Sequence, residues 1–171
     1  MVSIEEAMVV SDNTITFNST YKSSLSGIVH IPSIWNTVKI TIIGNYALQY
    51  FTEITHVYIQ EGIEEIGYAA FYGCSKLSYI QIPNSVNLIG NNVFFSIASG
   101  AEIWFVEGNN KITIKYLRYY DNYYYLRTTA PTFSLESYSP DIKYNFYVIN
   151  EDIKNKIEND VIYKVMYKKI Y

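Results

Sequence analysis

Few side chains in this sequence have the types and spacing that chemistry requires. The 171 residues include two histidines, His30 and His56, and one cysteine, Cys74. The sequence has no His-x-x-x-His motif, no paired cysteines and no glycine-rich phosphate loop, which are the patterns that hold metals and nucleotides. A single cysteine cannot form an internal disulfide, and Cys74 is predicted to lie in the core. We therefore expect no metal site and no cofactor.

A small acidic cluster is the remaining candidate for catalysis. Glu61, Glu64 and Glu65 follow one another closely along the chain. General acid and base catalysis needs carboxylates that face each other across a cleft. Three carboxylates in one short segment are more typical of a solvated edge. The sequence therefore predicts no catalytic residue, and we expect the protein not to be an enzyme.

Composition is that of one globular domain with an excess of tyrosine. Hydrophobic residues make up 49% and charged residues 17%, and the net charge is −3. This charge excludes the basic surface typical of nucleic-acid binding, and no apolar run is long enough to span a membrane. The 19 tyrosines allow two interpretations. Tyrosine suits half-exposed binding surfaces, and it also forms strands readily without any ligand.

The chain contains an internal repeat with a period of 23 residues. Residues 57–72, VYIQEGIEEIGYAAFY, match residues 80–95, IQIPNSVNLIGNNVFF, at apolar positions and one glycine. Earlier and later units are recognisable at VHIP (29–32) with IIG (42–44), and at IWFVEGNNKIT (103–113). A repeat this short cannot bury its own apolar face, so the units must stack into a solenoid. The matched pairs are Val57/Ile80, Ile59/Ile82, Ile63/Val86, Ile66/Ile89, Gly67/Gly90 and Phe71/Phe94.

These residues resemble the BspA-like leucine-rich repeats. The run IEEIGYAAFYGCSKLSYIQIPNSVNLIG is similar to the family pattern L-x-x-I-x-I-P-x-S-V-x-x-I-G-x-x-A-F-x-x-C, and the pieces YYYLRTTAPTF and FYVINEDIKNKIENDVIYKVMYKKI resemble its closing segment. The resemblance implies a mainly β fold with short turns and helices, built as a leucine-rich repeat solenoid of about four 23-residue units. Within one compact domain we expect N-terminal capping strands over 1–26, the solenoid over 27–117 and a C-terminal cap over 118–171.

Alternation and β-branched content predict the individual elements. A helix is predicted at 151–159, and a tyrosine-rich hairpin around the turn Asp121-Asn122. Strands are predicted at about 14–18, 28–31, 56–60, 79–82, 102–106, 112–117, 123–127 and 144–149.

Strand alternation also predicts which residues point outward. If the isoleucines and valines of each repeat strand point into the core, the residues between them must face solvent. A partner could dock on this surface or on the cap at Tyr123 and Tyr124, because aromatic residues are enriched at interaction hot spots. An equally good interpretation is an exposed sheet with favourable cross-strand pairs. The predicted outward rows are His30, Tyr58, Gln81 and Trp104, flanked by His56, Tyr79 and Glu102.

Two classes of function remain open. The resemblance implies a non-enzymatic binding or adhesion module that attaches to a host surface or matrix protein. The alternative is a structural subunit of a larger assembly, such as a bacteriophage fibre or decoration protein, which the absence of a leader at MVSIEEAMVVSDN favours. In that case the protein could pair with copies of itself. Localisation follows the function: the cell surface if a leader has been removed, the virion if the gene belongs to a phage.

Overall fold

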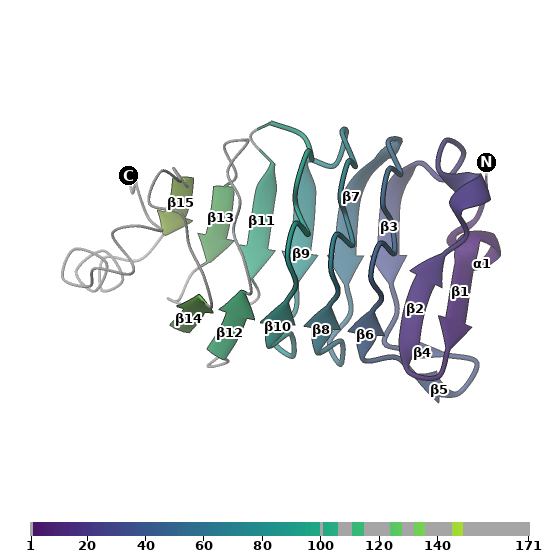
Figure 1. Cartoon of the computed structure of the whole chain (residues 1–171), viewed down its shortest axis with the longest axis horizontal. Helices are drawn as coiled ribbons and strands as arrows, with labels where there is room; N and C mark the ends of the chain where they lie inside the picture. The colour runs from purple at the N-terminus through teal and green to yellow at the C-terminus, as the bar shows by residue number, and fades with distance from the viewer. Residues whose placement is uncertain are drawn as a thin grey trace.

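The computed structural model is mainly β and describes residues 2–99 and 101–105, together with the strands 111–114, 124–127, 132–135 and 145–148. Figure 1 shows the chain winding through successive turns that stack along the long axis of the molecule. Each repeat contributes one strand to each of two sheets, and the core lies between them. The mainly β character predicted from the sequence is confirmed.

The longer repeat strands form a six-stranded sheet, and every neighbouring pair in it is parallel. Val57 pairs with Ile80 and Ile80 with Ile103, so the register follows the 23-residue period of the sequence. Parallel strands in this register place equivalent residues of successive repeats side by side. In spatial order the strands are β3 (Gly27–Ile31), β7 (Ile54–Ile59), β9 (Tyr79–Ile82), β11 (Glu102–Phe105), β13 (Tyr124–Arg127) and β15 (Asn145–Val148).

A second sheet has seven strands, several of which are only two residues long. It begins with an antiparallel pair, and all its later pairs are parallel. Sequence reasoning missed five of these strands, and three of the five have only two residues, which are too few to show alternation. The strands are β1 (Met8–Ser11), β2 (Thr14–Phe17), β6 (Ile42–Ile43), β8 (Glu65–Ile66), β10 (Leu88–Ile89), β12 (Lys111–Ile114) and β14 (Thr132–Leu135).

Small elements complete the N-terminal end of the stack. Helix α1 (Ile4–Ala7) starts with a capping box between Ser3 and Glu6, and the 3-10 turn η1 spans Ser19–Tyr21. The extra residues of the first repeat form a hairpin from β4 (Ile34–Trp35) and β5 (Val38–Lys39). Trp35 of this hairpin packs against the core cluster.

The third side of each turn carries a backbone ladder of its own. Tyr46 N–H donates to the Tyr68 carbonyl at 2.8 Å, and Tyr50 N–H donates to the Tyr72 carbonyl at 2.8 Å. We call the stacked segments 45–51, 68–74 and 91–97 the turn face. Left-handed backbone recurs there every 23 residues, at Tyr46, Ala69 and Asn92 and again at Tyr50, Gly73 and Ser96.

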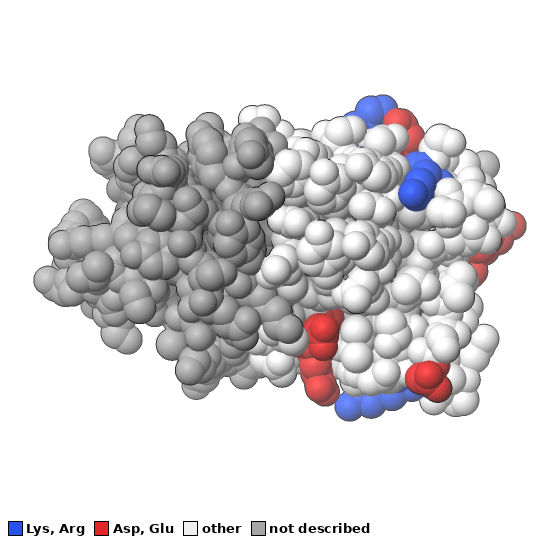
Figure 2. Space-filling model, in the orientation of Figure 1, with Lys and Arg blue, Asp and Glu red and all other residues white. Residues whose placement is uncertain are grey.

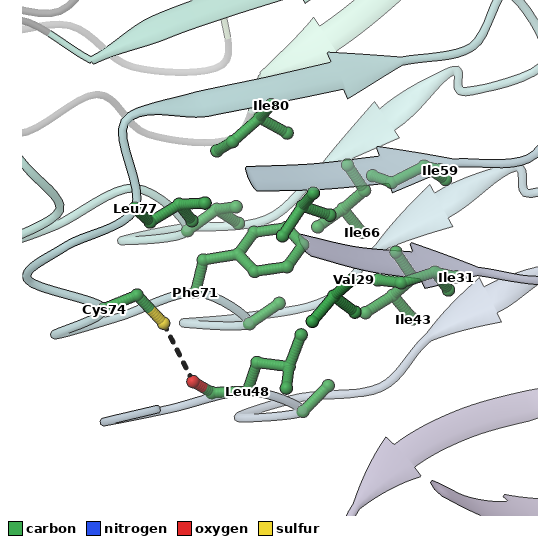
Figure 3. Close-up of a cluster of buried hydrophobic side chains, with 14 of the residues drawn as sticks. Val29, Ile31, Ile43, Leu48, Ile59, Ile66, Phe71, Cys74, Leu77 and Ile80 are labelled. Carbon is green, nitrogen blue, oxygen red and sulfur yellow. Dashed lines mark hydrogen bonds between the residues drawn. The ribbon is translucent and has the colours of Figure 1, made fainter. Parts of the chain in front are cut away.

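The core is one column of isoleucine, leucine, valine and phenylalanine. Phe71 lies fully buried among these residues (Figure 3). It stacks on Phe94 of the next turn with ring centroids 6.3 Å apart. The turns approach closely at the repeated glycines: a Cβ on Gly67 would lie 2.8 Å from the Asn45 backbone nitrogen. The prediction that Cys74 lies in the core is confirmed, since the side chain is buried and its Sγ donates to the Leu48 carbonyl at 3.0 Å.

The C-terminal part differs from the sequence prediction. We predicted about four repeats, but the six-stranded sheet continues in parallel through β13 and β15. These strands read YYLR and NFYV, so the Ile-x-Ile pattern that marks the earlier repeats is lost. The strands β12 and β13 lie in different sheets and do not form the predicted hairpin. The turn Asp121-Asn122 and the helix predicted at 151–159 lie outside the described residues.

Candidate interaction surface

The outer face of the six-stranded sheet brings the predicted rows together. His30 pairs with Tyr58, Tyr58 with Gln81, and Gln81 with Trp104. The flanking row follows the same register, because His56 pairs with Tyr79 and Tyr79 with Glu102. The alternating buried residues, such as Val57 and Ile80, lie on the core side. The sheet therefore presents both predicted rows on its solvent-facing side.

Five rings from these rows form a continuous ladder, which we call the sheet ladder. His30 stacks on Tyr58 with ring centroids 5.0 Å apart and an interplanar angle of 12°. Tyr79 is the centre of the ladder: its ring lies 5.4 Å from Tyr58, 5.7 Å from His56 and 6.4 Å from Trp104. These separations are in the range of favourable aromatic pairs. The rings therefore support one another in fixed positions before any partner arrives.

Polar contacts hold the margins of the sheet ladder. The Trp104 indole Nε1 donates to Glu102 Oε2 at 3.1 Å, and His56 Nδ1 lies 2.9 Å from Thr55 Oγ1. Burial raises the pKa of the Tyr79 hydroxyl, and the neighbouring Tyr58 and Glu102 raise it further. Tyr79 is thus held in its neutral form, with its hydroxyl available as both donor and acceptor.

The two tyrosines predicted at the C-terminal cap have different outcomes. Tyr124 pairs with Glu102, so its backbone continues the flanking row by one more strand. Tyr123 lies outside the described residues. Sequence reasoning placed Tyr124 in a separate cap, whereas the register places it in the same row as His56, Tyr79 and Glu102.

The turn face carries a second aromatic surface that the sequence analysis did not identify. Tyr46 meets Tyr68 edge-on at 5.1 Å, and Tyr50 meets Tyr72 edge-on at 5.4 Å, so the tyrosines form two ridges. The signal was present in the sequence as tyrosines spaced four and 22 residues apart. It was missed because strand alternation, which predicted the outward rows, does not show which residues of the turns face outward. Between the ridges lies a hollow of about 350 Å³, lined by Tyr46, Gln49, Tyr50, Tyr68, Ala69, Tyr72, Asn92 and Phe95.

The three acidic residues of the cluster lie in β8 and in the segment just before it. Glu64 pairs with Lys39 at 3.8 Å, and Glu61 Oε2 accepts the Asn84 backbone N–H at 3.1 Å. The side chains of Glu61 and Glu64 are exposed, and that of Glu65 is half-buried. Among the described residues, no group of three or more His, Cys, Asp or Glu side chains is arranged to hold a metal ion.

Comparison with known proteins identifies the family. The model of the BspA type leucine-rich repeat region matches six copies over residues 13–140, which is more than half of the chain. The chain belongs to this family. Six strands of the second sheet lie within the matched residues: β2, β6, β8, β10, β12 and β14.

Similarity outside the family model is limited. The chain is similar to the crystal structure of a leucine-rich repeat protein from T. pallidum, with 20% sequence identity and a TM-score of 0.45. The likeness covers 57% of this chain and 49% of that one, so it extends over about half the length of that protein. No curated protein matches the chain. Within the described part of this BspA-type repeat protein, no helix is long and apolar enough to cross a membrane.

Proposed function

We propose that this leucine-rich repeat protein is a non-enzymatic binding module that docks a protein partner on the sheet ladder. Leucine-rich repeat domains generally mediate protein–protein interactions, and their stacked strands form extended surfaces suited to that task. Adhesion to a host surface or matrix protein is the form of binding that we favour. The observation that carries the proposal is the continuous ring ladder from His30 to Trp104.

The sheet ladder has the properties of an interaction hot spot. Tyrosine and tryptophan bring large contact areas and few rotatable bonds, so little conformational entropy is lost when they are immobilised. Tyr58, Tyr79 and Trp104 are already half-buried by their neighbours, which restricts them further before binding. Gln81, which lies between Tyr58 and Trp104 in the row, and Glu102, in the flanking row, supply polar groups. A partner would meet a preorganised aromatic surface with hydrogen-bonding groups around it.

The same surface could also join copies of this chain or other subunits of an assembly. A structural subunit, including one of a virion, would use the ladder as a permanent contact rather than as a site for a foreign ligand. The two forms differ in one measurable property, because a self-contact makes the molar mass depend on protein concentration.

Two experiments with one ladder variant and one control variant test the proposal. Tyr58→Ala/Trp104→Ala removes two of the five rings, while Tyr46→Ala/Tyr50→Ala removes two exposed rings from the turn face as a matched control. Solid-phase binding to a panel of purified matrix proteins, such as collagen, laminin and fibronectin, is measured for both variants. Light scattering on a sizing column across a range of protein concentrations gives the molar mass.

The outcomes separate the alternatives. Binding by the parent protein that falls at least about tenfold in Tyr58→Ala/Trp104→Ala, but not in the control, supports an adhesion module. A stable oligomer that dissociates only in the same variant supports an assembly subunit. A ladder variant that matches the parent protein in both measurements would overturn the proposal.

A further inference from the structure

The hollow on the turn face has the size and lining of a ligand site. Its volume of about 350 Å³ falls in the usual range for small binding sites. The rings beside it remain accessible: Tyr46 is 51% exposed, Tyr50 48% and Tyr68 38%. The buried residues of the same segments, such as Leu48 and Phe71, are part of the core and hold the hollow's base in place.

The tyrosine ridges are rigidly supported. Successive turns are joined by the backbone ladder described above, and Asn45 Oδ1 also accepts the Tyr68 N–H at 2.7 Å. Asn92 Nδ2 donates to the Tyr68 hydroxyl at 3.2 Å, and Tyr72 stacks on Phe95 at 4.8 Å. We call this hollow the tyrosine groove. Because these contacts hold its side chains in place, the groove loses little conformational entropy when a ligand binds.

The groove is free of charge. The segments 45–51, 68–74 and 91–97 contain no Asp, Glu, Lys or Arg. Figure 2 shows that uncharged side chains cover the centre of the described part of the face turned to the viewer. Lys22 reaches the border, where its Nζ lies 5.5 Å from the centre of the Tyr50 ring. A phosphorylated or strongly acidic ligand would need a cluster of arginines or lysines that these segments lack.

The polar groups of the groove are side-chain hydroxyls and amides. Burial raises the pKa of the Tyr72 hydroxyl, with a further contribution from Tyr50, so the hydroxyl keeps its proton. The backbone donors of Tyr46, Leu48 and Tyr50 are already used in the ladder between turns. An extended peptide therefore cannot add to the groove as a β-strand, because strand addition needs free backbone groups. The groove suits a ligand that accepts hydrogen bonds from tyrosine and Gln49.

We propose that the tyrosine groove of the turn face binds a proline-rich peptide segment in the polyproline II conformation. Such a segment has no internal hydrogen bonds, and its prolines offer carbonyl acceptors without N–H donors. Aromatic-lined grooves with hydroxyl and amide donors are the usual receptors for this conformation. The spacing also fits, because the polyproline II helix repeats every ~9 Å. Successive turns of the protein are ~4.8 Å apart, so two such spacings cover nearly the same distance.

The inference deepens the proposed protein-binding function by adding a second site with a defined ligand class. The two sites lie on different sides of the coil and use different residues. Failure at one site is therefore distinguishable from failure at the other.

The test uses fluorescein-labelled decaproline as the probe and fluorescence anisotropy as the measurement. Tyr46→Ala/Tyr50→Ala removes one exposed ring from each ridge, and Tyr58→Ala/Trp104→Ala is the matched control on the sheet. A labelled glycine-serine decapeptide controls for non-specific binding, and cellohexaose is added as a competing neutral ligand. Tyr50→Phe/Tyr72→Phe keeps the rings and removes two hydroxyls, so it separates ring stacking from hydrogen bonding.

We expect decaproline to bind the parent protein and the sheet variant alike, and to bind Tyr46→Ala/Tyr50→Ala at least about tenfold more weakly. The phenylalanine variant should lose part of the affinity. No saturable binding at about 1 mM decaproline would overturn the inference. An equal loss of decaproline affinity in the sheet variant would also overturn it. So would binding of the glycine-serine peptide with the same affinity as decaproline, which would indicate a non-specific site, or displacement of decaproline by cellohexaose, which would indicate a saccharide site.

Discussion

At the scale of single residues, Cys74 shows how the stack controls reactivity. Its thiol is fully buried, and burial raises its pKa to about 12. The thiolate is the reactive form, so the native thiol should resist alkylating and disulfide reagents at neutral pH. We expect Ellman's reagent to label Cys74 only at the rate at which the protein opens, and labelling should rise steeply through the urea unfolding transition. Rapid labelling of the native protein would contradict the burial.

The same raised pKa predicts a pH dependence of stability. The unfolded thiol ionises near its ordinary pKa of 9.0, while the native thiol stays protonated to about 12. The contribution of the protonated thiol to the unfolding free energy is therefore complete below pH 9 and is lost as the pH rises from 9 towards 12. The difference in unfolding free energy between the parent protein and Cys74→Ala should fall by on the order of 1 kcal/mol per pH unit in this range. Urea titrations at pH 8, 9 and 10 measure it, and a constant difference would contradict the prediction.

Tyr79 tests the electrostatics of the sheet ladder. Its pKa is raised by burial first, and then by Tyr58 and Glu102. Glu102→Gln removes one of these causes, so the pKa of Tyr79 should move down towards its ordinary value. NMR titration of protein labelled with ¹³C at the tyrosine Cζ resolves the shift. Glu5→Gln on helix α1 is the control and should leave Tyr79 unchanged; an identical shift in both variants would mean that Glu102 does not act locally.

At the scale of elements, the repeated glycines decide how closely the turns stack. A Cβ on Gly67 would lie 2.8 Å from the Asn45 nitrogen, and a Cβ on Gly90 would lie 2.8 Å from the Tyr68 nitrogen. These are backbone atoms, which cannot move without separating two turns. We expect Gly67→Ala and Gly90→Ala each to cost about 1–3 kcal/mol in unfolding free energy, measured by urea denaturation.

Gly44 provides an internal control for that prediction. The atom closest to a Cβ on Gly44 is the Thr16 side-chain methyl, at 2.7 Å, and the Ile15 carbonyl is 3.4 Å away. A threonine side chain can rotate, whereas a neighbouring backbone cannot. Gly44→Ala should therefore cost less than Gly67→Ala. Equal costs at the two positions would show that backbone contact is not what selects glycine here.

The sequence predicted best the strands that carry the repeat pattern. β9 was predicted with the bounds observed, and β3, β7 and β11 to within two residues, because each has alternating apolar residues that recur from one repeat to the next. The pairing of Tyr58 with Gln81, and so the outward row, followed directly from the 23-residue period. β8 and β10 have only two residues each and gave no pattern. The tyrosine groove was missed because its lining depends on left-handed backbone at Tyr46 and Tyr50, which is unusual for tyrosine.

At the scale of the whole molecule, each turn contacts only its neighbours, so stability depends on every interface along the stack. The chain has one tryptophan near each end of the fully described region: Trp35 in β4 and Trp104 in β11. The single-tryptophan variants Trp104→Phe and Trp35→Phe therefore report separately on the two regions. Fluorescence-detected urea unfolding should give coincident midpoints if the stack unfolds as one unit.

Phe71 lies between these two reporters and connects the turns on either side of it. It is fully buried and stacks on Phe94, and Cys74 of the same turn bonds to the Leu48 carbonyl of the preceding one. Phe71→Ala should lower the unfolding free energy by about 3–5 kcal/mol. Because the loss weakens the middle of the column, we also expect the Trp35 and Trp104 midpoints to separate. If both tryptophans instead report the same lowered midpoint, the column still unfolds as one unit without Phe71, which would contradict this prediction.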